Sequence, residues 1–129
     1  MQVKIDTKEK FHVITILDAQ ITANMTDELE AGLSDYLQND VKNLVVDLSS
    51  VAGMDQAAAE LFVRLQQRFQ EENASFVVCG MQPAVENFLE AQELLELLNT
   101  TPTESEAWDI VQMEEIEREL LGDDEPGVE

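Results

Sequence analysis

Two carboxylates and two hydroxyls lie close enough together in the chain to do chemistry. Asp47 and Asp55 lie on either side of Ser49 and Ser50, next to a predicted helix N-terminus. Two carboxylates beside a hydroxyl could share the roles of acid and base. Asp47, however, lies inside an apolar run, where a lone carboxylate more often forms a hydrogen bond that ends a strand. The pattern favours a structural role, and we predict no catalytic residues.

The single histidine and the single cysteine offer no metal site. His12 has no second histidine and no cysteine near it, and a transition-metal site normally needs several converging ligands. Cys79 lies in an apolar run, where a buried thiol is common. The five glycines are isolated, and no Gly-Lys-Ser/Thr follows a strand, so no phosphate-binding loop is predicted. We expect neither a metal nor a cofactor.

A strand, a turn and a helix position Asp55. The β-branched run 44–48, bounded by polar residues, predicts a central strand that is covered on both faces. Apolar residues then recur at helical spacing, which predicts a helix from Gln56 to about Glu72. Asp55 suits the N-cap of that helix, because its carboxylate can accept hydrogen bonds from the backbone of the first turn. Gln56 then lies in the first turn.

The other segments alternate between strand and helix patterns. The order β-β-α-β-α-β-α-(β)-α predicts a single α/β domain with a mixed, mostly parallel sheet of four to five strands and about four to five helices. A short polar link favours an antiparallel hairpin for the first two strands. Further strands are predicted at 2–6, 11–17 and 75–80. Further helices are predicted at about 27–38, from Pro83 onward and from 103 onward. The segment 94–98 suits either an edge strand or a helix end.

The composition is strongly acidic, with 28 Asp and Glu against 7 Lys and Arg and a net charge of −21. Such a surface repels nucleic acid phosphates and anionic lipid, so we predict no nucleic acid binding. No apolar run approaches 20 residues, and the amino terminus is not built like a signal peptide. We expect a cytoplasmic protein without membrane insertion. The acidity fits either a solvated surface or the steering of a basic partner.

Residues 45–55, Val-Val-Asp-Leu-Ser-Ser-Val-Ala-Gly-Met-Asp, and the small-residue helix start after them resemble the STAS domain family, the bacterial anti-sigma-factor antagonists and their relatives. The similarity continues through 74–89, where a strand, a glycine, a proline and a helix follow in the family's order. It ends near 105–110, which resembles the family's last helix. The resemblance implies a STAS-like fold and a role in bacterial signal transduction and transcription regulation.

The resemblance also divides the chain. It implies a STAS-like domain over 1–112, and the apolar pattern beyond it predicts a C-terminal helical extension over 113–121. The acidic composition with two glycines and a proline predicts a disordered tail over 122–129. The apolar residues Ile116, Leu120 and Leu121 of the extension could pack on the chain's own domain, on a twin chain or on a partner. Packing on the own domain is the ordinary expectation, and a homodimer through this helix is an alternative.

The phosphorylation site of the family has no counterpart here. Its turn usually reads Asp-Ser-Ser/Thr-Gly, and a partner that is both anti-sigma factor and kinase phosphorylates the first serine. The matching positions are Asp55, Gln56, Ala57 and Ala58. Gln56 has no hydroxyl and does not mimic the charge of phosphoserine, so the usual switch cannot operate there. Whether Ser49 or Ser50 serves as an alternative acceptor stays open.

The resemblance implies a non-catalytic, regulatory protein-interaction module and not an enzyme. Its partner would be an anti-sigma factor and serine kinase of the histidine-kinase-like ATPase type. Alternatives are a STAS scaffold subunit of a transporter or sensory complex, or a small-anion or nucleotide-binding domain that uses the helix N-terminus. We expect the partner surface to include the turn and the outward side of the helix, namely Met54, Asp55, Gln56, Ala57, Glu60, Val63 and Arg64, with Glu60 and Arg64 paired at i,i+4.

Overall fold

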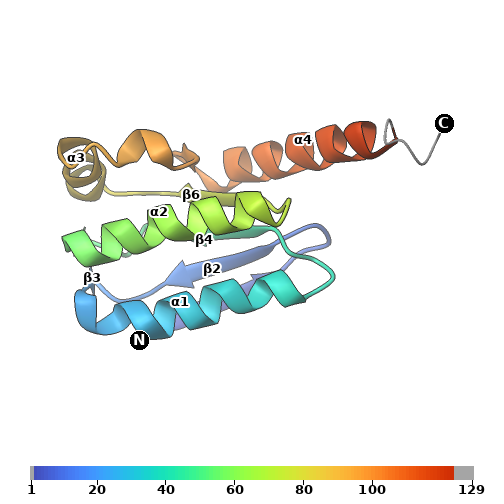
Figure 1. Ribbon diagram of the computed structural model, residues 1–129. Coiled ribbons are helices and arrows are strands. Elements are labelled where there is room, and N and C mark those ends of the chain that lie inside the picture. The colour runs from blue at the N-terminus through green and yellow to red at the C-terminus, as the bar shows by residue number, and fades with distance from the viewer. Residues whose placement is uncertain (1, 124–129) are drawn as a thin grey trace.

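Alternating strands and helices form one five-stranded sheet with helices on both of its faces (Figure 1). The computed structural model describes residues 2–123, with side chains up to 120. The sheet order is β1-β2-β4-β6-β7, and β3 and β5 form a separate two-stranded sheet. The elements are β1 Val3–Thr7, β2 His12–Ile16, β3 Gln20–Ile21, η1 Ala23–Met25, α1 Thr26–Ser34, η2 Asp35–Gln38, β4 Leu44–Asp47, β5 Gly53–Met54, α2 Gln56–Glu71, β6 Phe76–Cys79, α3 Pro83–Ala91, η3 Leu95–Leu97, β7 Thr100–Thr101 and α4 Glu104–Asp123.

The strand pairing confirms the predicted mixed, mostly parallel sheet. β1 runs antiparallel to β2, and the pairs β2 with β4, β4 with β6 and β6 with β7 are all parallel. The central strands β4 and β6 are buried on both faces, which explains their continuous apolar sequences. The carboxyl ends of these parallel strands therefore lie at one end of the sheet, and the turn before α2 follows β4 in the chain.

Two apolar cores lie on the two faces of the sheet. Leu44 and Val46 of β4 belong to the larger core, which also holds the buried apolar residues of α1, α2 and α3. Val45 points the other way and packs with Ala107 and Val111 of α4 in the smaller core. Successive side chains of β4 thus point alternately into the two cores.

The helices differ in detail from the sequence prediction. The predicted helix at about 27–38 divides into α1 and η2, so it ends in a 3-10 turn, and the 3-10 turn η1 precedes it. The ambiguous segment 94–98 contains η3, and the last strand, β7, comes a few residues later. Neither β3 nor β5 was expected, because two-residue strands have no periodicity to detect.

α4 continues as one helix through the predicted extension and includes Gly122 and Asp123, where the tail was expected to begin. The rest of that predicted tail, 124–129, lies outside the described residues. Met113, Ile116 and Leu120 are 62%, 56% and 61% exposed. Ile116 and Leu120 therefore do not pack on their own domain as expected, and the side chain of Leu121 lies outside the described residues.

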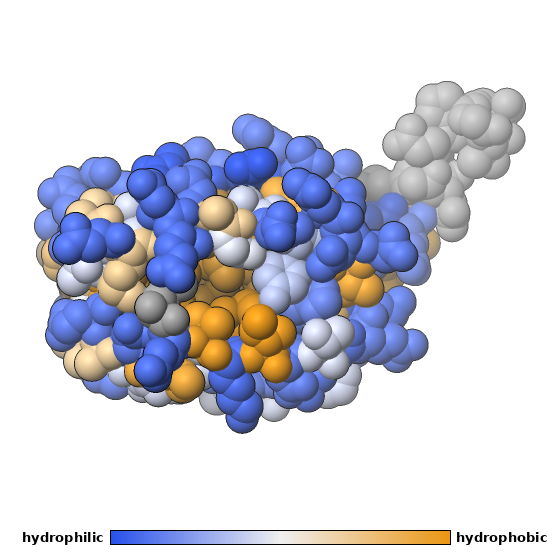
Figure 2. All heavy atoms as spheres, turned by 90° about the horizontal axis from the view of Figure 1, so that it is seen from below, coloured by the Kyte–Doolittle hydropathy of each residue, from blue (hydrophilic) through white to orange (hydrophobic). Residues whose placement is uncertain are grey.

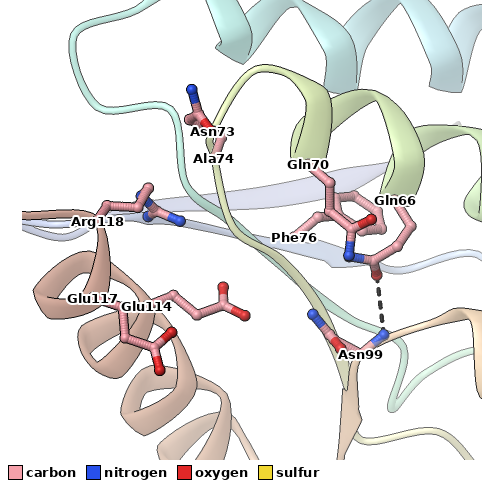
Figure 3. Close-up of a pocket in the computed structure, with 9 residues that line it drawn as sticks. All are labelled: Gln66, Gln70, Asn73, Ala74, Phe76, Asn99, Glu114, Glu117 and Arg118. Atoms are coloured by element: carbon pink, nitrogen blue, oxygen red, sulfur yellow. Dashed lines mark hydrogen bonds between the residues drawn. The ribbon is translucent and has the colours of Figure 1, made fainter. Parts of the chain in front are cut away.

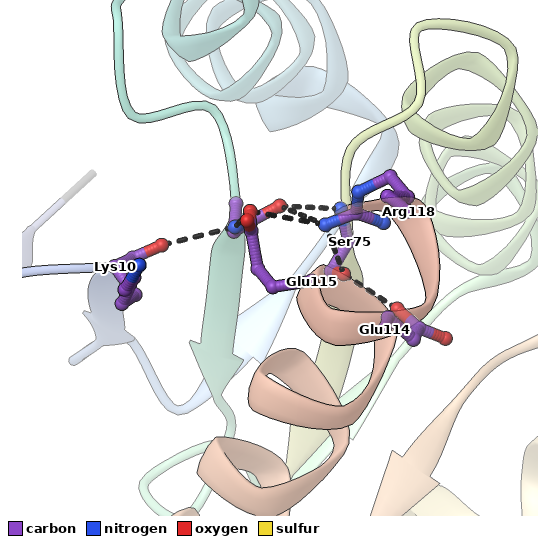
Figure 4. A network of polar contacts seen from close by, with 6 residues as sticks. Lys10, Ser75, Glu114, Glu115 and Arg118 are labelled. Atoms are coloured by element: carbon purple, nitrogen blue, oxygen red, sulfur yellow. Dashed lines mark hydrogen bonds and ion pairs between the residues drawn. The ribbon is translucent and has the colours of Figure 1, made fainter. Parts of the chain in front are cut away.

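Polar side chains hold the second half of α4 instead (Figure 4). Asn43, which is buried at the start of β4, donates to Glu115 and accepts a bond of 3.1 Å from Arg118. Ser75, buried before β6, donates to Glu114 and accepts a bond of 3.2 Å from Arg118. We call these five residues the α4 latch. It fixes which side of the helix faces the sheet.

β1 is the edge strand, and every residue of it is exposed. Val3 and Ile5 pair with Ile16 and Ile14, so they lie on the face of the sheet that carries the larger core. Figure 2 views the molecule from the side on which α1 and the N-terminus lie in Figure 1, and it shows apolar side chains gathered in a hollow there. This edge of the sheet has no strand beyond it in the described part of the chain.

Candidate functional site

Asp55 caps α2 and holds a second segment at the same time. One oxygen of its carboxylate accepts a hydrogen bond of 3.0 Å from the backbone N–H of Ala58, as an N-cap residue does. The other oxygen accepts a bond of 2.8 Å from the backbone N–H of Ala23. The predicted cap is confirmed, and the bond to Ala23 links the turn to the start of η1. Both carboxylate oxygens are therefore occupied within the protein.

The short β3–β5 pair holds the backbone of the turn in place. The backbone N–H of Asp55 donates to the carbonyl of Ile21 at 3.1 Å, directly after the paired residues. The side chain of Gln20 lies against Gly53, where an added Cβ would come within 2.8 Å of the Gln20 Oε1 atom. Gly53 thus permits a close approach that a larger residue would block. Gln20 and Ala23 belong to this site although the sequence alone did not indicate them.

Exposed polar side chains line the outer side of the first turns of α2. The Gln56 side chain is exposed, and its Nε2 donates to Glu60 Oε2 at 3.2 Å. Ala57 is half-buried beside it. Arg64, one turn further along the helix, forms an ion pair of 3.5 Å with Glu30 of α1. The expected pair between Glu60 and Arg64 is therefore replaced by contacts of each residue with a different neighbour.

Two residues of the expected surface are buried. Met54 is only 8% exposed and Val63 only 9%, and both belong to the larger core. Val63 lies one turn from Gln66, whose Oε1 accepts a bond from the backbone N–H of Asn99, so this flank of α2 faces the segment after α3. The expectation that Val63 points outward is wrong. The accessible part of the predicted surface consists of Gln56, Ala57, Glu60 and Arg64 around the partly buried Asp55.

The second carboxylate of the stretch has a structural role. Asp47 accepts a hydrogen bond of 2.9 Å from the backbone N–H of Ser49 at the end of β4, as the sequence favoured. The carbonyl of Ser49 in turn accepts a bond of 2.9 Å from Gln82 Nε2. The hydroxyls of Ser49 and Ser50 belong to exposed residues. Since both oxygens of Asp55 are bound elsewhere, these residues do not assemble a two-carboxylate site.

A family model described as the STAS domain matches residues 2–107 of the chain. The chain belongs to the STAS domain family. A comparison with curated proteins found no match.

Solved structures share the fold of this STAS domain at low sequence identity. An anti-sigma factor antagonist from Mycobacterium paratuberculosis is 18% identical with a TM-score of 0.75, over 86% of this chain and 93% of that one. A putative anti-sigma factor antagonist from Thermotoga maritima is 16% identical with a TM-score of 0.73, over 85% and 94%. The murine anion transporter Slc26a9 is 12% identical with a TM-score of 0.68, over 81% of this chain and 18% of the transporter.

The remaining candidate residues of the STAS domain lie away from the turn. His12 is buried, with its ring nitrogens 3.1 Å from Thr7 Oγ1 and 3.1 Å from the carbonyl of Val41. Burial, with the nearby carboxylates of Asp47 and Glu104, raises the pKa of the Cys79 thiol to about 12. Within residues 2–123 no three His, Cys, Asp or Glu side chains are grouped to hold a metal, and no helix is long and apolar enough to cross a membrane.

A small polar cavity of about 210 Å³ lies between α2, β6 and α4 (Figure 3). Gln66 lines it, and its Oε1 accepts a bond of 3.0 Å from the backbone N–H of Asn99. Its Nε2 has no partner among the described residues. Amides and carboxylates form most of the lining, which is the environment of a hydrated pocket. The cavity lies on the far side of the molecule from the Asp55 turn and adds nothing to that site.

Proposed function

We propose that this STAS domain is a cytoplasmic, non-catalytic regulatory module that binds a protein partner in the manner of an anti-sigma-factor antagonist. The partner surface consists of Gln56, Ala57, Glu60 and Arg64, arranged around the Asp55 turn. The observation that carries the proposal is the double anchoring of Asp55, which leaves the next two residues accessible on a fixed backbone. A preorganised surface loses little conformational entropy when it binds.

The partner in this proposal is an anti-sigma factor and serine kinase of the histidine-kinase-like ATPase type. The family membership and the resemblance of the turn support it. Gln56 and Ala57 carry no hydroxyl, so the partner cannot phosphorylate the turn. Without that modification the surface stays neutral at Gln56 and permits binding at all times. The module is then a permanently active antagonist, unless Ser49 or Ser50 accepts the phosphate.

Ala57→Arg tests the partner surface. The long cationic side chain should weaken binding to the captured partner about tenfold or more, because it lies at the centre of the surface. The free energy of unfolding should change by only about 0.5 kcal/mol, since the first turn of α2 is accessible there. Calorimetric titration and thermal unfolding measure the two quantities.

Gln67→Arg is the matched control for this test, because Gln67 is an exposed residue of the same helix beyond the proposed surface. It should bind the partner like the wild type. Equal affinity of both variants would move the interface away from the start of α2.

A scaffold subunit of a transporter is the second candidate, and the fold similarity to a domain of an anion transporter favours it. Affinity capture from the native host with mass spectrometry distinguishes the two: a histidine-kinase-like ATPase supports the antagonist, and transporter subunits support the scaffold. A small-anion site at the start of α2 has less support, because the carboxylate of Asp55 already occupies that end of the helix.

A further inference from the structure

The second half of α4 carries an apolar face that nothing covers within residues 2–123. Met113, Ile116 and Leu120 are each more than half exposed. They are spaced by three and four residues, so they lie on one side of the helix, as the seam of a two-helix contact does. The STAS domain match ends at residue 107, so this face lies beyond the part of the chain that the family shares.

The α4 latch keeps this face turned away from the domain. Glu114, Glu115 and Arg118 are tied to the starts of β4 and β6 (Figure 4). Earlier in the helix, Ala107 and Val111 are fully buried against the sheet. Since both halves of α4 are fixed on the same side, the helix cannot rotate to bury Met113 and Ile116 without breaking the latch.

The rim of the apolar face is acidic. Asp109, Glu117 and Glu119 are exposed residues of the same helix. The one basic residue of α4 is Arg118, and it is bound to Asn43, Ser75 and Glu115. On the helix itself the three apolar side chains are framed by carboxylates. Lys10 is the basic residue beside them, and it lines a groove with Ile116 and Glu119.

We propose that Met113, Ile116 and Leu120, with the carboxylates of Asp109, Glu117 and Glu119 as rim, form a docking face for a basic amphipathic helix of a partner protein. The three- and four-residue spacing fits the apolar stripe of a facing helix. Lysine or arginine residues beside that stripe would complement the acidic rim and speed association. A STAS domain of this kind binds two partners at two separate surfaces.

Charge distinguishes this occupant from the others. A second copy would bring another acidic rim onto the first, in a chain with net charge −21. An anionic membrane is repelled for the same reason. The chain's own residues 124–129 include Asp124, Glu125 and Glu129 and so repeat the charge of the rim.

The docking face and the Asp55 turn lie at opposite ends of the molecule. In Figure 1 α2 begins at one end of the sheet, and α4 runs out past the other end. The latch contacts agree, since they join α4 to the starts of β4 and β6 rather than to their ends. The two surfaces can therefore be tested separately, and failure of one leaves the other unaffected.

Three designed helical peptides of equal length test the proposal with the full chain. The first has a leucine stripe flanked by lysine, the second has the same stripe flanked by glutamate, and the third has the lysines with a scrambled stripe. Fluorescence anisotropy should show that the first binds at least about tenfold more tightly than either of the others. Shifts in the nitrogen–proton NMR spectrum should map to 109–120.

Ile116→Ser should weaken binding of the first peptide about tenfold, because the substitution removes a central apolar contact. The control is Leu97→Ser in η3, which is 48% exposed and should bind like the wild type. Glu117→Gln with Glu119→Gln should weaken binding and reduce its dependence on salt.

Three results would overturn the proposal. Equal binding of the first and third peptides would show attraction to net charge alone, and wild-type affinity of Ile116→Ser would place the peptide elsewhere. A dimer that forms with rising protein concentration in sedimentation, and that Ile116→Ser abolishes, would assign the face to a second copy of the chain.

Discussion

Asp55 joins two segments with one carboxylate, and this sets the character of the turn at the scale of single residues. Its bonds to Ala58 and Ala23 fix the backbone on both sides of Gln56. Gln56 itself contacts only Glu60 among the bonds described. The turn therefore combines a rigid frame with one accessible neutral side chain, and the chemistry of that side chain decides what a partner meets.

Gln56→Asp should preserve stability and weaken binding to the captured partner. A carboxylate in the first turn gains about 0.3 to 1 kcal/mol from the helix dipole, while it faces Glu60 across one turn at a cost of about 0.2 to 0.5 kcal/mol. The melting temperature should therefore stay within about 2 °C. At the interface the new charge must lose water, which is costly.

Thermal unfolding and calorimetric titration check this prediction, and the neutral Gln56→Asn is the control that should keep its affinity. Gln56→Ser adds a second readout, because a host kinase that phosphorylates it would restore the family's switch. Unchanged binding of Gln56→Asp, together with no phosphate on Gln56→Ser, would favour the scaffold role.

The Cys79 thiol should resist modification in the folded protein. Its pKa of about 12 keeps it neutral, because burial and then the carboxylates of Asp47 and Glu104 disfavour the thiolate. A disulfide reagent at pH 8 should label it slowly in the native state and at once in urea. Rapid labelling without denaturant would mean that β6 opens locally.

The same shift lowers stability at high pH. The unfolded thiol ionises above its ordinary pKa of about 8.5, whereas the folded thiol does not. Folding stability that depends on Cys79 is thus complete below about pH 8.5 and falls as the pH rises toward 12. Cys79→Ala should lose this part of the pH dependence.

At the scale of elements, the regular strands and helices could be predicted because each carries its own periodicity. β4, β6 and α2 appear close to the predicted bounds, and Asp55 caps α2 as expected. The β3–β5 pair could not be predicted, because two residues show no period and their partners lie far apart in the chain. The burial of Val63 depends on the rest of the larger core, which the sequence of α2 does not specify.

The α4 latch is the clearest case of structure beyond sequence patterns. Asn43 and Ser75 are polar residues at the starts of apolar strands, and Arg118 is far away in the chain. The helix continues past residue 112 as predicted, but apolar residues were expected to dock it on the domain. The polar residues dock it, because buried amide and hydroxyl groups at the strand ends need hydrogen-bond partners.

Glu115→Gln should reveal the contribution of the latch to stability. Partial burial favours the neutral acid, but hydrogen bonds from Asn43 and Arg118 and the charge of Lys10 outweigh it and lower the pKa of Glu115. A lowered pKa stabilises the fold fully above the ordinary carboxyl value of about 4.3, and that contribution disappears as the pH falls through the folded value.

Urea unfolding between pH 3 and pH 7 measures this difference. The wild type should exceed Glu115→Gln by about 1 kcal/mol near pH 7 and match it near pH 3, since the other carboxylates titrate in both proteins. A constant difference across this range would show that the charge of Glu115 does not matter.

At the scale of the whole molecule, the net charge of −21 opposes compactness. Most of the acidic side chains lie on exposed surfaces, and few basic residues are available to pair with them. Self-repulsion of this kind destabilises a folded chain while it keeps separate chains apart. The same charge gives the proposed docking face its preference for a basic partner.

Added salt should therefore stabilise the protein. Between about 10 mM and 200 mM NaCl the screening length falls from about 30 Å to less than 10 Å, which shortens the reach of repulsion across the surface. We expect the melting temperature to rise by about 5 °C, most of it below 200 mM. Calorimetric scans in NaCl and in KCl at equal ionic strength should agree. A flat response would mean that the charges are already neutralised.

The net charge also affects how the exposed edge strand β1 meets other copies of the chain. Its outer backbone groups are free to pair with another strand, and Val3 and Ile5 offer an apolar strip beside them. Edges of this kind are starting points for aggregation unless charge or covering protects them. Here Lys4 and Asp6 on the strand and the collective repulsion of the surface supply that charge, and the net repulsion vanishes near the isoelectric point of about 4.1. We therefore expect mild acid to let sheets of separate chains join edge to edge through β1.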